Sequence, residues 1–159
     1  MVPQAPKTWW RVKVAAGALL IALLVVHFVF GGQLSALSLP RWLGQSLVLL
    51  GAGITLFHYR LLQHGTGGPV PRLVSQGGLF RWVRHPMYLG DALLYLGLAL
   101  LIPGFASTIV LLTGWYALYR QADSEDQAMA EYFANDFEQW KSRTGLMLPV
   151  LSGRRTVGK

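Results

Sequence analysis

Apolar positions along the chain gather into four long runs, which short polar stretches separate. The runs cover 12–30, 42–61, 87–102 and 105–119. The first holds nineteen residues and would rise about 28 Å as a helix, enough to cross the hydrocarbon core of a bilayer. None alternates apolar and polar residues as a barrel strand does, and backbone in lipid must satisfy its own hydrogen bonds. The pattern therefore predicts an all-α, polytopic membrane bundle of four transmembrane helices.

The third and fourth runs are joined by Pro103-Gly104. Proline and glycine interrupt helices most strongly, so this step predicts a tight turn. The two runs are then the arms of a helical hairpin, and their outer ends lie on one side of the bilayer. The first run follows basic residues, as the apolar part of a signal peptide does. It is longer than such segments, however, and further runs follow it, so we expect a retained helix.

Two polar regions of different character lie outside the runs. The segment 63–86 begins with many Gly and Pro residues and predicts a cytoplasmic loop. The segment 121–143 predicts an amphipathic cytoplasmic helix, because its apolar residues recur at helical spacing and form one stripe. The stripe consists of Met129, Phe133, Phe137 and Trp140. It would pack against the bundle or the headgroups, or cover a site on that side of the membrane.

Charged residues make up only 13% of the chain, about half of what a soluble domain carries, and the net charge is +7. Thirteen of the fourteen Lys and Arg residues fall on one side of the predicted bundle, and Arg41 is the exception. Because cytoplasmic loops carry excess Lys and Arg, both termini are predicted to be cytoplasmic, in what we take to be a bacterial inner membrane. Clusters beside apolar runs indicate contacts with membrane lipids rather than with nucleic acid. The sequence has no cysteine, which excludes disulfides and thiolate metal sites, and no metal site is predicted.

The stretch RHPMYLG at 84–90 places polar side chains at the start of the third run. Pro86 suits the first turn of a helix, whose free N–H groups and positive dipole end would face the cytoplasm. Arg84 and His85 beside this end predict a seat for an anionic group such as a carboxylate. A plainer alternative exists for each, since an interfacial Arg often binds headgroups and a His can simply begin a helix.

Tyr88, Asp91 and Tyr95 follow at helical spacing and share one helix face. A carboxylate inside a spanning run is costly and normally faces a polar cavity, so Asp91 is a candidate functional residue. The alternative is a structural ion pair between Asp91 and an Arg.

Six of the seven acidic residues lie between Asp123 and Glu138. They would stabilise the start of the tail helix through its dipole, or aim a carboxylate at a cation or hydroxyl. Because the hairpin returns the chain to the same membrane face, we predict that Glu125 meets Arg84 and His85 in one pocket. A pocket that holds both signs of charge suits a ligand that carries both.

These motifs together resemble a known family. GGLFRWVRHPMYLG, the hairpin, EDQAM, FANDFEQW and LMLP resemble the C-terminal signature of the isoprenylcysteine carboxyl methyltransferase family and its relatives, the phospholipid N-methyltransferases. The resemblance covers about residues 64–149, and Arg-His-Pro-x-Tyr-x-Gly with an acidic pair at this distance is its most specific part. The first two runs match only in hydropathy. The departures from the family pattern are Asp126 for the second Glu, Ala134 for Gly, and Phe137 and Trp140 for two Tyr residues.

The resemblance implies S-adenosylmethionine as methyl donor, held in a cytoplasm-facing pocket that the tail partly covers. It also implies a lipophilic acceptor that enters from the bilayer. The residues that would belong to the cofactor pocket are His85, Tyr88, Leu89, Gly90 and Glu125. Gly90 also has a simpler explanation, because small residues allow close helix packing in membranes.

Four residues are the catalytic candidates. Arg84 or Arg120 would orient an anionic acceptor, which is already ionised and needs no base. Glu125 or Asp91 would take a proton from an amine acceptor. The acceptor itself stays open among a prenylated thioether carboxylate, a phospholipid amine and a small apolar molecule.

Two other interpretations remain. The membrane sterol reductases share this C-terminal pattern, including HPMYLGD at 85–91, and use NADPH, but this chain is short for their sterol pocket. A non-enzymatic membrane protein that keeps an inherited fold is the third hypothesis. The methyltransferase is favoured, and a chain this small invites a homo-oligomer that encloses the cofactor.

Overall fold

The regular elements of the computed structural model, which describes residues 6–30, 39–66, 73 and 77–150, are all helical. In order they are α1 (Lys7–Val29), α2 (Leu39–Thr66), the 3-10 helix η1 (Gly78–Arg81), α3 (Pro86–Leu101) and α4 (Phe105–Arg143). Within the described ranges the extended pairing is limited to one isolated parallel bridge between Val83 and Gly145. The prediction of an all-α protein is confirmed.

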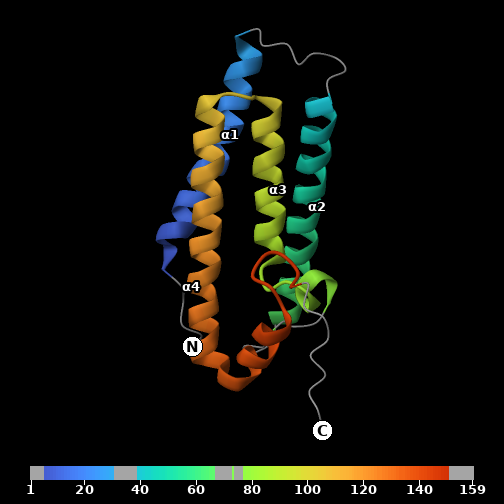
Figure 1. Ribbon diagram of the computed structural model, residues 1–159, viewed down its shortest axis with the longest axis vertical. Helices are drawn as coiled ribbons and strands as arrows, with labels where there is room; N and C mark the ends of the chain where they lie inside the picture. The colour runs from blue at the N-terminus through green and yellow to red at the C-terminus, as the bar shows by residue number, and fades with distance from the viewer. Residues whose placement is uncertain (1–5, 31–38, 67–72, 74–76, 151–159) are drawn as a thin grey trace.

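The four α-helices run side by side along the long axis, and α3 and α4 are joined at one end as a hairpin (Figure 1). At the turn, the Ser107 hydroxyl donates to the carbonyls of Ile102 at 2.7 Å and Gly104 at 2.9 Å. These bonds satisfy backbone acceptors that a helix end leaves free. The hairpin sets α3 and α4 antiparallel, so the start of α3 lies near the middle of the long helix α4.

One described helix, α1, is both long and apolar enough to cross a bilayer, by its length and composition. The apolar helix α3 has 16 residues, which rise about 24 Å and fall short of a hydrocarbon core of about 30 Å. In α2, polar residues such as Gln45, Ser46 and His58 interrupt the apolar run. The composition of the described helices therefore does not establish the predicted four transmembrane crossings.

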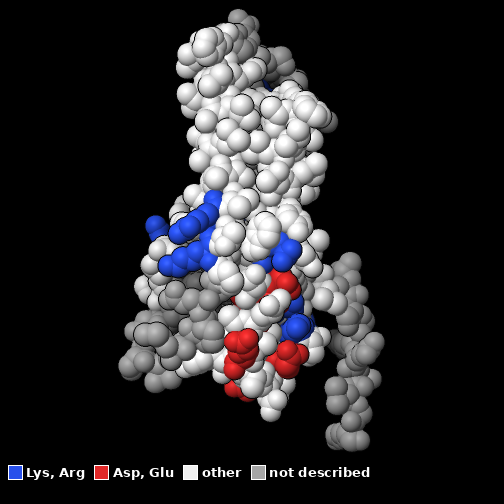
Figure 2. Space-filling view, turned by 90° about the vertical axis from the view of Figure 1, so that its left-hand side faces the viewer, with Lys and Arg blue, Asp and Glu red and all other residues white. Residues whose placement is uncertain are grey.

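The surface of α1 and α4 nevertheless divides into two zones (Figure 2). Lys and Arg side chains form a band at mid-height, Asp and Glu lie below it, and the upper part is almost free of charge. Large apolar side chains are exposed in the C-terminal half of α1 and the first half of α4, among them Val25 and Leu112. A continuous apolar surface of this kind indicates contact with lipid.

The contact between α2 and α3 depends on paired glycines. A Cβ placed on Gly51 would lie 2.5 Å from the Gly90 carbonyl oxygen, and one on Gly97 would lie 2.6 Å from the Gly44 carbonyl oxygen. Only residues without side chains let the two backbones approach this closely. The packing role considered for Gly90 is therefore observed.

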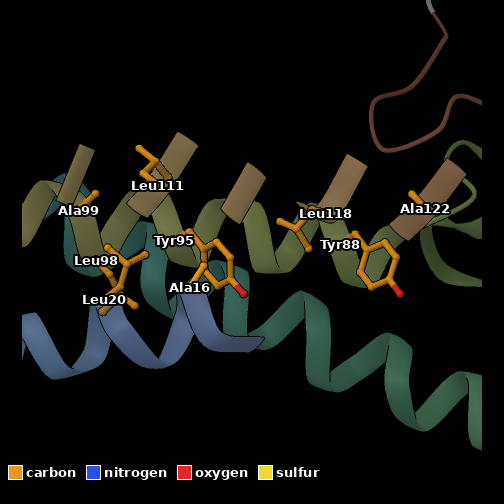
Figure 3. Packing of buried hydrophobic residues seen from close by; sticks show 9 residues of the cluster. All are labelled: Ala16, Leu20, Tyr88, Tyr95, Leu98, Ala99, Leu111, Leu118 and Ala122. Atoms are coloured by element: carbon orange, nitrogen blue, oxygen red, sulfur yellow. The ribbon is translucent and has the colours of Figure 1, made fainter. Parts of the chain in front are cut away.

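The core fills the space between α1, α3 and α4 (Figure 3). Ala16 and Leu20 of α1 face Tyr95 and Leu98 of α3, and Leu118 of α4 joins the same core further along, beside Tyr88. The Tyr95 hydroxyl donates to the Lys13 carbonyl at 2.6 Å, so the one polar atom of this ring is satisfied. The core thus holds α1, which lies outside the region of family resemblance, firmly against the hairpin.

The long helix α4 breaks late. It passes residue 120, where we expected the fourth transmembrane helix to end, and its first non-helical residue is Ala134, with φ 44° and ψ −116°. The chain then turns back, and Phe137 and Trp140 pack with Phe80 of η1, together with Met129 and Phe133 from before the break. The residues of the predicted apolar stripe before and after the break therefore pack in one cluster with η1.

Candidate functional site

The start of α3 is held by backbone bonds to the tail of the chain. The amides of Arg84 and His85 donate to the carbonyls of Gly145 at 2.8 Å and Leu146 at 2.9 Å, and the amide of Gly145 donates to the Trp82 carbonyl at 3.0 Å. Pro86 occupies the first turn of α3, as predicted, and His85 precedes it at the N-cap position without a side-chain capping hydrogen bond. The tail is thereby a strap across this helix end, which supports the cover proposed for the stripe.

Asp126 of α4 binds both basic residues of the RHP motif. Its Oδ2 lies 2.8 Å from Arg84 Nε, and its Oδ1 lies 2.8 Å from His85 Nε2. All three side chains are less than a tenth exposed. The Nη1 group of Arg84 also donates to the carbonyls of Thr144 and, at 3.3 Å, Lys141. Arg84 therefore ties α3, α4 and the tail together.

Glu125 lies beside this pair and is about one third exposed. Its Oε1 accepts from the Tyr88 hydroxyl at 2.6 Å and from Gln121 Nε2 at 2.9 Å. Its Oε2 lies 3.5 Å from His85 Nδ1. Of the three residues predicted to meet at the end of the hairpin, His85 and Glu125 lie close together, and Arg84 is linked to them through Asp126, which was not predicted. We call Arg84, His85, Tyr88, Glu125 and Asp126 the charged cluster.

These contacts shift the pKa values of His85, Glu125 and Asp126. Burial alone would lower the pKa of His85, but hydrogen bonds to Asp126 and Glu125 and their negative charges outweigh it and raise that pKa above 6.5. Burial would conversely raise the pKa of both carboxyl groups, yet their bonds to His85 and other donors lower each of them. These shifts favour the protonated form of His85 and the ionised forms of both carboxyl groups.

A second polar group lies one helical turn further along α3. Asp91 Oδ2 is 3.0 Å from Lys13 Nζ, and its Oδ1 accepts from the Thr55 hydroxyl at 3.1 Å. Lys13 Nζ also lies 4.2 Å from the centre of the Tyr88 ring, and that ring stacks on His85 with 5.4 Å between ring centres. The expected structural pairing of Asp91 exists, with a Lys from α1 in place of an Arg.

Sequence reasoning missed Lys13, Thr55 and Gln121 as members of this region. Lys13 had been counted only as a signal of orientation. Its position as the one charged residue of the run 12–30 was the available signal, because a charge inside a spanning segment normally faces a polar partner. No comparable signal marked Thr55 or Gln121, which are common on helices.

Three predicted site residues lie apart from the charged cluster. Arg120 points to the outer face of α4, where it donates to the Tyr116 hydroxyl at 3.0 Å and lies 5.0 Å from the Trp9 ring. One residue along a helix is a rotation of 100°, so Arg120 cannot share the face of Gln121 and Glu125. Leu89 is half-buried on α3, and Gly90 faces Thr55 and Gly51 of α2.

The fold and the site together define a class of protein. It is all-helical, has one helix that is a candidate membrane span, and carries a buried charged cluster where the α3–α4 hairpin meets the tail. A family model described as phospholipid methyltransferase matches residues 39–136. The chain therefore belongs to the phospholipid methyltransferase family, whose members are associated with membranes.

Among curated proteins, the chain is similar to the Protein-S-isoprenylcysteine O-methyltransferase of Schizosaccharomyces pombe. The two are 26% identical over 80 residues, which make up 50% of this chain and 34% of that protein. No solved structure matches the chain significantly. The resemblance noted from the motifs is confirmed at the level of the family.

Proposed function

We propose that the protein is an S-adenosylmethionine-dependent methyltransferase that acts on a lipophilic acceptor at the cytoplasmic face of a membrane. The observation that carries the proposal is the direct contact of His85 and Tyr88 with Glu125 and Asp126. These residues come from two motifs about forty positions apart, and all four lie inside the region that matches the family. Both matches are to methyltransferases, which favours this hypothesis over the reductase.

The hydrogen-bond donors and acceptors of the charged cluster are compatible with S-adenosylmethionine. Glu125 remains partly exposed, and its lowered pKa keeps it ionised, so it can accept hydrogen bonds from hydroxyl or ammonium groups. His85, Tyr88, Leu89 and Gly90 stay assigned to the cofactor region by the resemblance. For Gly90 the role would be indirect, because its own neighbours are residues of α2. The cofactor would supply an activated methyl group on a cationic sulfur.

Methyl transfer is an in-line displacement that needs the acceptor close and water excluded. The strap formed by the tail and the buried Arg84–Asp126 pair would serve the second requirement, since both pack against the start of α3 and the two charged side chains are less than a tenth exposed. Arg84 then acts as a positioning residue that holds Asp126 and, through it, His85. Arg120 on the outer face becomes our candidate for orienting an anionic acceptor.

Proton transfer is needed only for an amine acceptor. Glu125 is the better candidate base, because it is more exposed than Asp91, whose carboxylate is engaged by Lys13 and Thr55. A carboxylate acceptor would need no base, and Glu125 would then serve only in binding. The lipid class of the acceptor is therefore the part of the proposal that an assay has to supply.

The test is cofactor binding followed by transfer. We expect the purified protein in detergent to bind S-adenosylhomocysteine saturably in calorimetry, and to transfer a labelled methyl group to membrane lipids or prenylcysteine analogues. His85→Ala and Glu125→Gln should each weaken binding at least about tenfold, the change that follows when one charge-assisted hydrogen bond is lost. Saturable binding of NADPH without S-adenosylhomocysteine binding would contradict the proposal.

A further inference from the structure

One buried polar atom beside the charged cluster lacks a partner. Gln121 is 3% exposed, and its Nε2 group donates to Glu125 Oε1 at 2.9 Å. Its Oε1 atom is the buried side-chain atom that has no hydrogen-bond partner among the described residues. Buried acceptors are almost always satisfied, so this exception calls for a donor that comes from outside the chain.

The orientation of the amide is well determined. A flipped side chain would bring Oε1 against the carboxylate of Glu125, and two acceptors would repel each other. With Nε2 bound to Glu125, the unpaired Oε1 lies on the same amide group and therefore next to that carboxylate. The two acceptors come from positions four apart on one face of α4 and are available to the same donor.

Charge favours a cationic donor. Asp126 is compensated by Arg84 and His85 at 2.8 Å, whereas the nearest cation to Glu125 is His85 Nδ1 at the longer distance of 3.5 Å. The ammonium group of Lys13 is occupied by Asp91 and by the Tyr88 ring. Glu125 is thus the least compensated carboxylate of the charged cluster, and it lies beside a neutral oxygen that accepts but cannot donate there.

We propose that Gln121 Oε1 and Glu125 bind a primary ammonium group of the ligand. This inference rests on the proposed function, and it assigns Gln121 a role in recognition. An ammonium group offers three N–H donors, enough for both oxygens, whereas a quaternary ammonium offers none. The group has two possible sources, the amino-acid part of an S-adenosyl ligand and the headgroup of an ethanolamine phospholipid.

The charged cluster contains both basic and acidic side chains, which fits both sources. Arg84 Nε and His85 Nε2 each lie 2.8 Å from Asp126, and His85 Nδ1 lies 3.5 Å from Glu125, so a ligand that carries both charges would find a partner for each. Both an amino acid and a phosphoethanolamine headgroup carry an anionic group next to their ammonium. Leu146 and Met147 of the tail pack against the core cluster that includes Tyr88 and Ala122, so the tail lies close to this region.

The experiment compares Gln121→Met with a matched control. Gln127 lies on the same helix, is exposed, and donates to Asp123 four residues away at 3.0 Å, as Gln121 does to Glu125. Calorimetry on the full chain in detergent would measure S-adenosylhomocysteine and 5′-methylthioadenosine, which lacks the amino-acid part. A second arm would compare melting temperatures in micelles that contain phosphatidylethanolamine or phosphatidylcholine.

For a cofactor source, Gln121→Met should weaken S-adenosylhomocysteine binding by about tenfold or more and leave 5′-methylthioadenosine unchanged. For a lipid source, phosphatidylethanolamine should raise the melting temperature of the wild type above its value in phosphatidylcholine, and Gln121→Met should abolish the difference. Gln127→Met should behave as wild type in both arms. Gln121→Met also removes the Nε2 hydrogen bond to Glu125, so the melting temperature of each variant in phosphatidylcholine is the reference for its own lipid difference.

The outcomes separate this inference from the proposed function. If the wild type binds S-adenosylhomocysteine but Gln121→Met matches it in both arms, the ammonium site is wrong and the methyltransferase proposal stands. If S-adenosylhomocysteine does not bind, but the difference in melting temperature between the two lipids depends on Gln121, the ammonium site is supported and the proposed cofactor is wrong. If neither arm depends on Gln121, the inference is overturned.

Discussion

The side chains of the charged cluster depend on one another for their charge, because ion pairs and hydrogen bonds link them. Asp126 binds Arg84 and His85, and His85 reaches Glu125, so each charge is stabilised by neighbours that are themselves buried. Isolated, any of these charges would be costly away from water. The cluster is therefore sensitive to pH and to substitutions that change charge without changing shape.

The raised pKa of His85 predicts a loss of stability at alkaline pH. Because this pKa is above 6.5 in the folded protein, the contribution of protonated His85 is fully present below about 6.5 and is lost as pH rises through the folded-state pKa. Melting temperatures measured in detergent from pH 6 to about pH 9 should therefore fall, and His85→Gln should flatten this dependence. His64→Gln, a change at an exposed histidine, should keep the wild-type slope; a wild-type slope in His85→Gln would contradict the prediction.

Neutralising Asp126 should be far more costly than neutralising Asp123. Asp126→Asn leaves Arg84 buried without its counter-charge and leaves His85 with Glu125 alone at 3.5 Å, and breaking such a buried pair costs roughly 3 kcal/mol. Asp123→Asn, at a carboxylate that binds only Gln127 at the surface, should change the free energy of unfolding by less than about 0.5 kcal/mol. Denaturant titration in detergent micelles measures both. Equal effects would mean that the Asp126 contacts are not strongly stabilising.

At the scale of the elements, the break in α4 decides how the site is covered. Residues after Ala134 return along η1, where Trp140 Nε1 donates to the Phe80 carbonyl at 2.9 Å. That return carries Thr144 and Gly145 to the start of α3, where they bind Arg84 and complete the strap. An unbroken α4 would project the tail away from the charged cluster.

The break also predicts a stabilising substitution. Ala134 has a positive φ of 44°, a conformation that costs an L-residue about 1 kcal/mol or more and that glycine adopts freely. The family pattern that the sequence resembles has glycine at this position. Ala134→Gly should raise the free energy of unfolding by about 1 kcal/mol, as measured by denaturant titration in detergent.

A control substitution on the same helix should change the free energy of unfolding in the opposite direction. Ala128 has regular helical geometry, so Ala128→Gly should lower the free energy of unfolding by about 0.5–1 kcal/mol. Destabilisation by both substitutions would show that the backbone at Ala134 does not adopt the positive φ in solution.

For the whole molecule, the open question is how many helices cross the membrane. Only α1 is a clear candidate among the described helices, yet the upper surface of α1 and α4 is almost uncharged (Figure 2). If α3 and α4 cross as a pair, the turn at Gly104 lies on the side opposite to the charged cluster and the tail. The arrangement in Figure 1 is compatible with that placement, since the turn and the tail lie at opposite ends.

Cysteine labelling can test the crossing, because the native chain has no cysteine. Gly104→Cys and Ser142→Cys introduce single thiols at exposed positions, and the Cβ at Gly104 meets no other atom within 4 Å. A membrane-impermeant maleimide should label Gly104→Cys only from outside the cell and Ser142→Cys only after the inner face is opened. Labelling of both from one side would rule out the crossing hairpin.

The sequence by itself determined the helical class, the hairpin and the residues that meet at its end. Apolar runs in lipid leave the backbone no alternative to helices, and Pro103-Gly104 leaves little alternative to a turn, so Glu125 had to return toward Arg84 and His85. Local patterns carry this information because it depends on neighbours along the chain.

Only the tertiary structure decided the partners. It placed Lys13 of α1 against Asp91, committed Arg84 to Asp126 and the tail, turned Arg120 outward and left Gln121 Oε1 unpaired. It also joined the apolar run 105–119 and the segment after it into one helix that stays regular as far as Ala134. These outcomes depend on the rotation of each helix about its axis and on contacts between segments distant in the chain, and hydropathy along the sequence does not encode either.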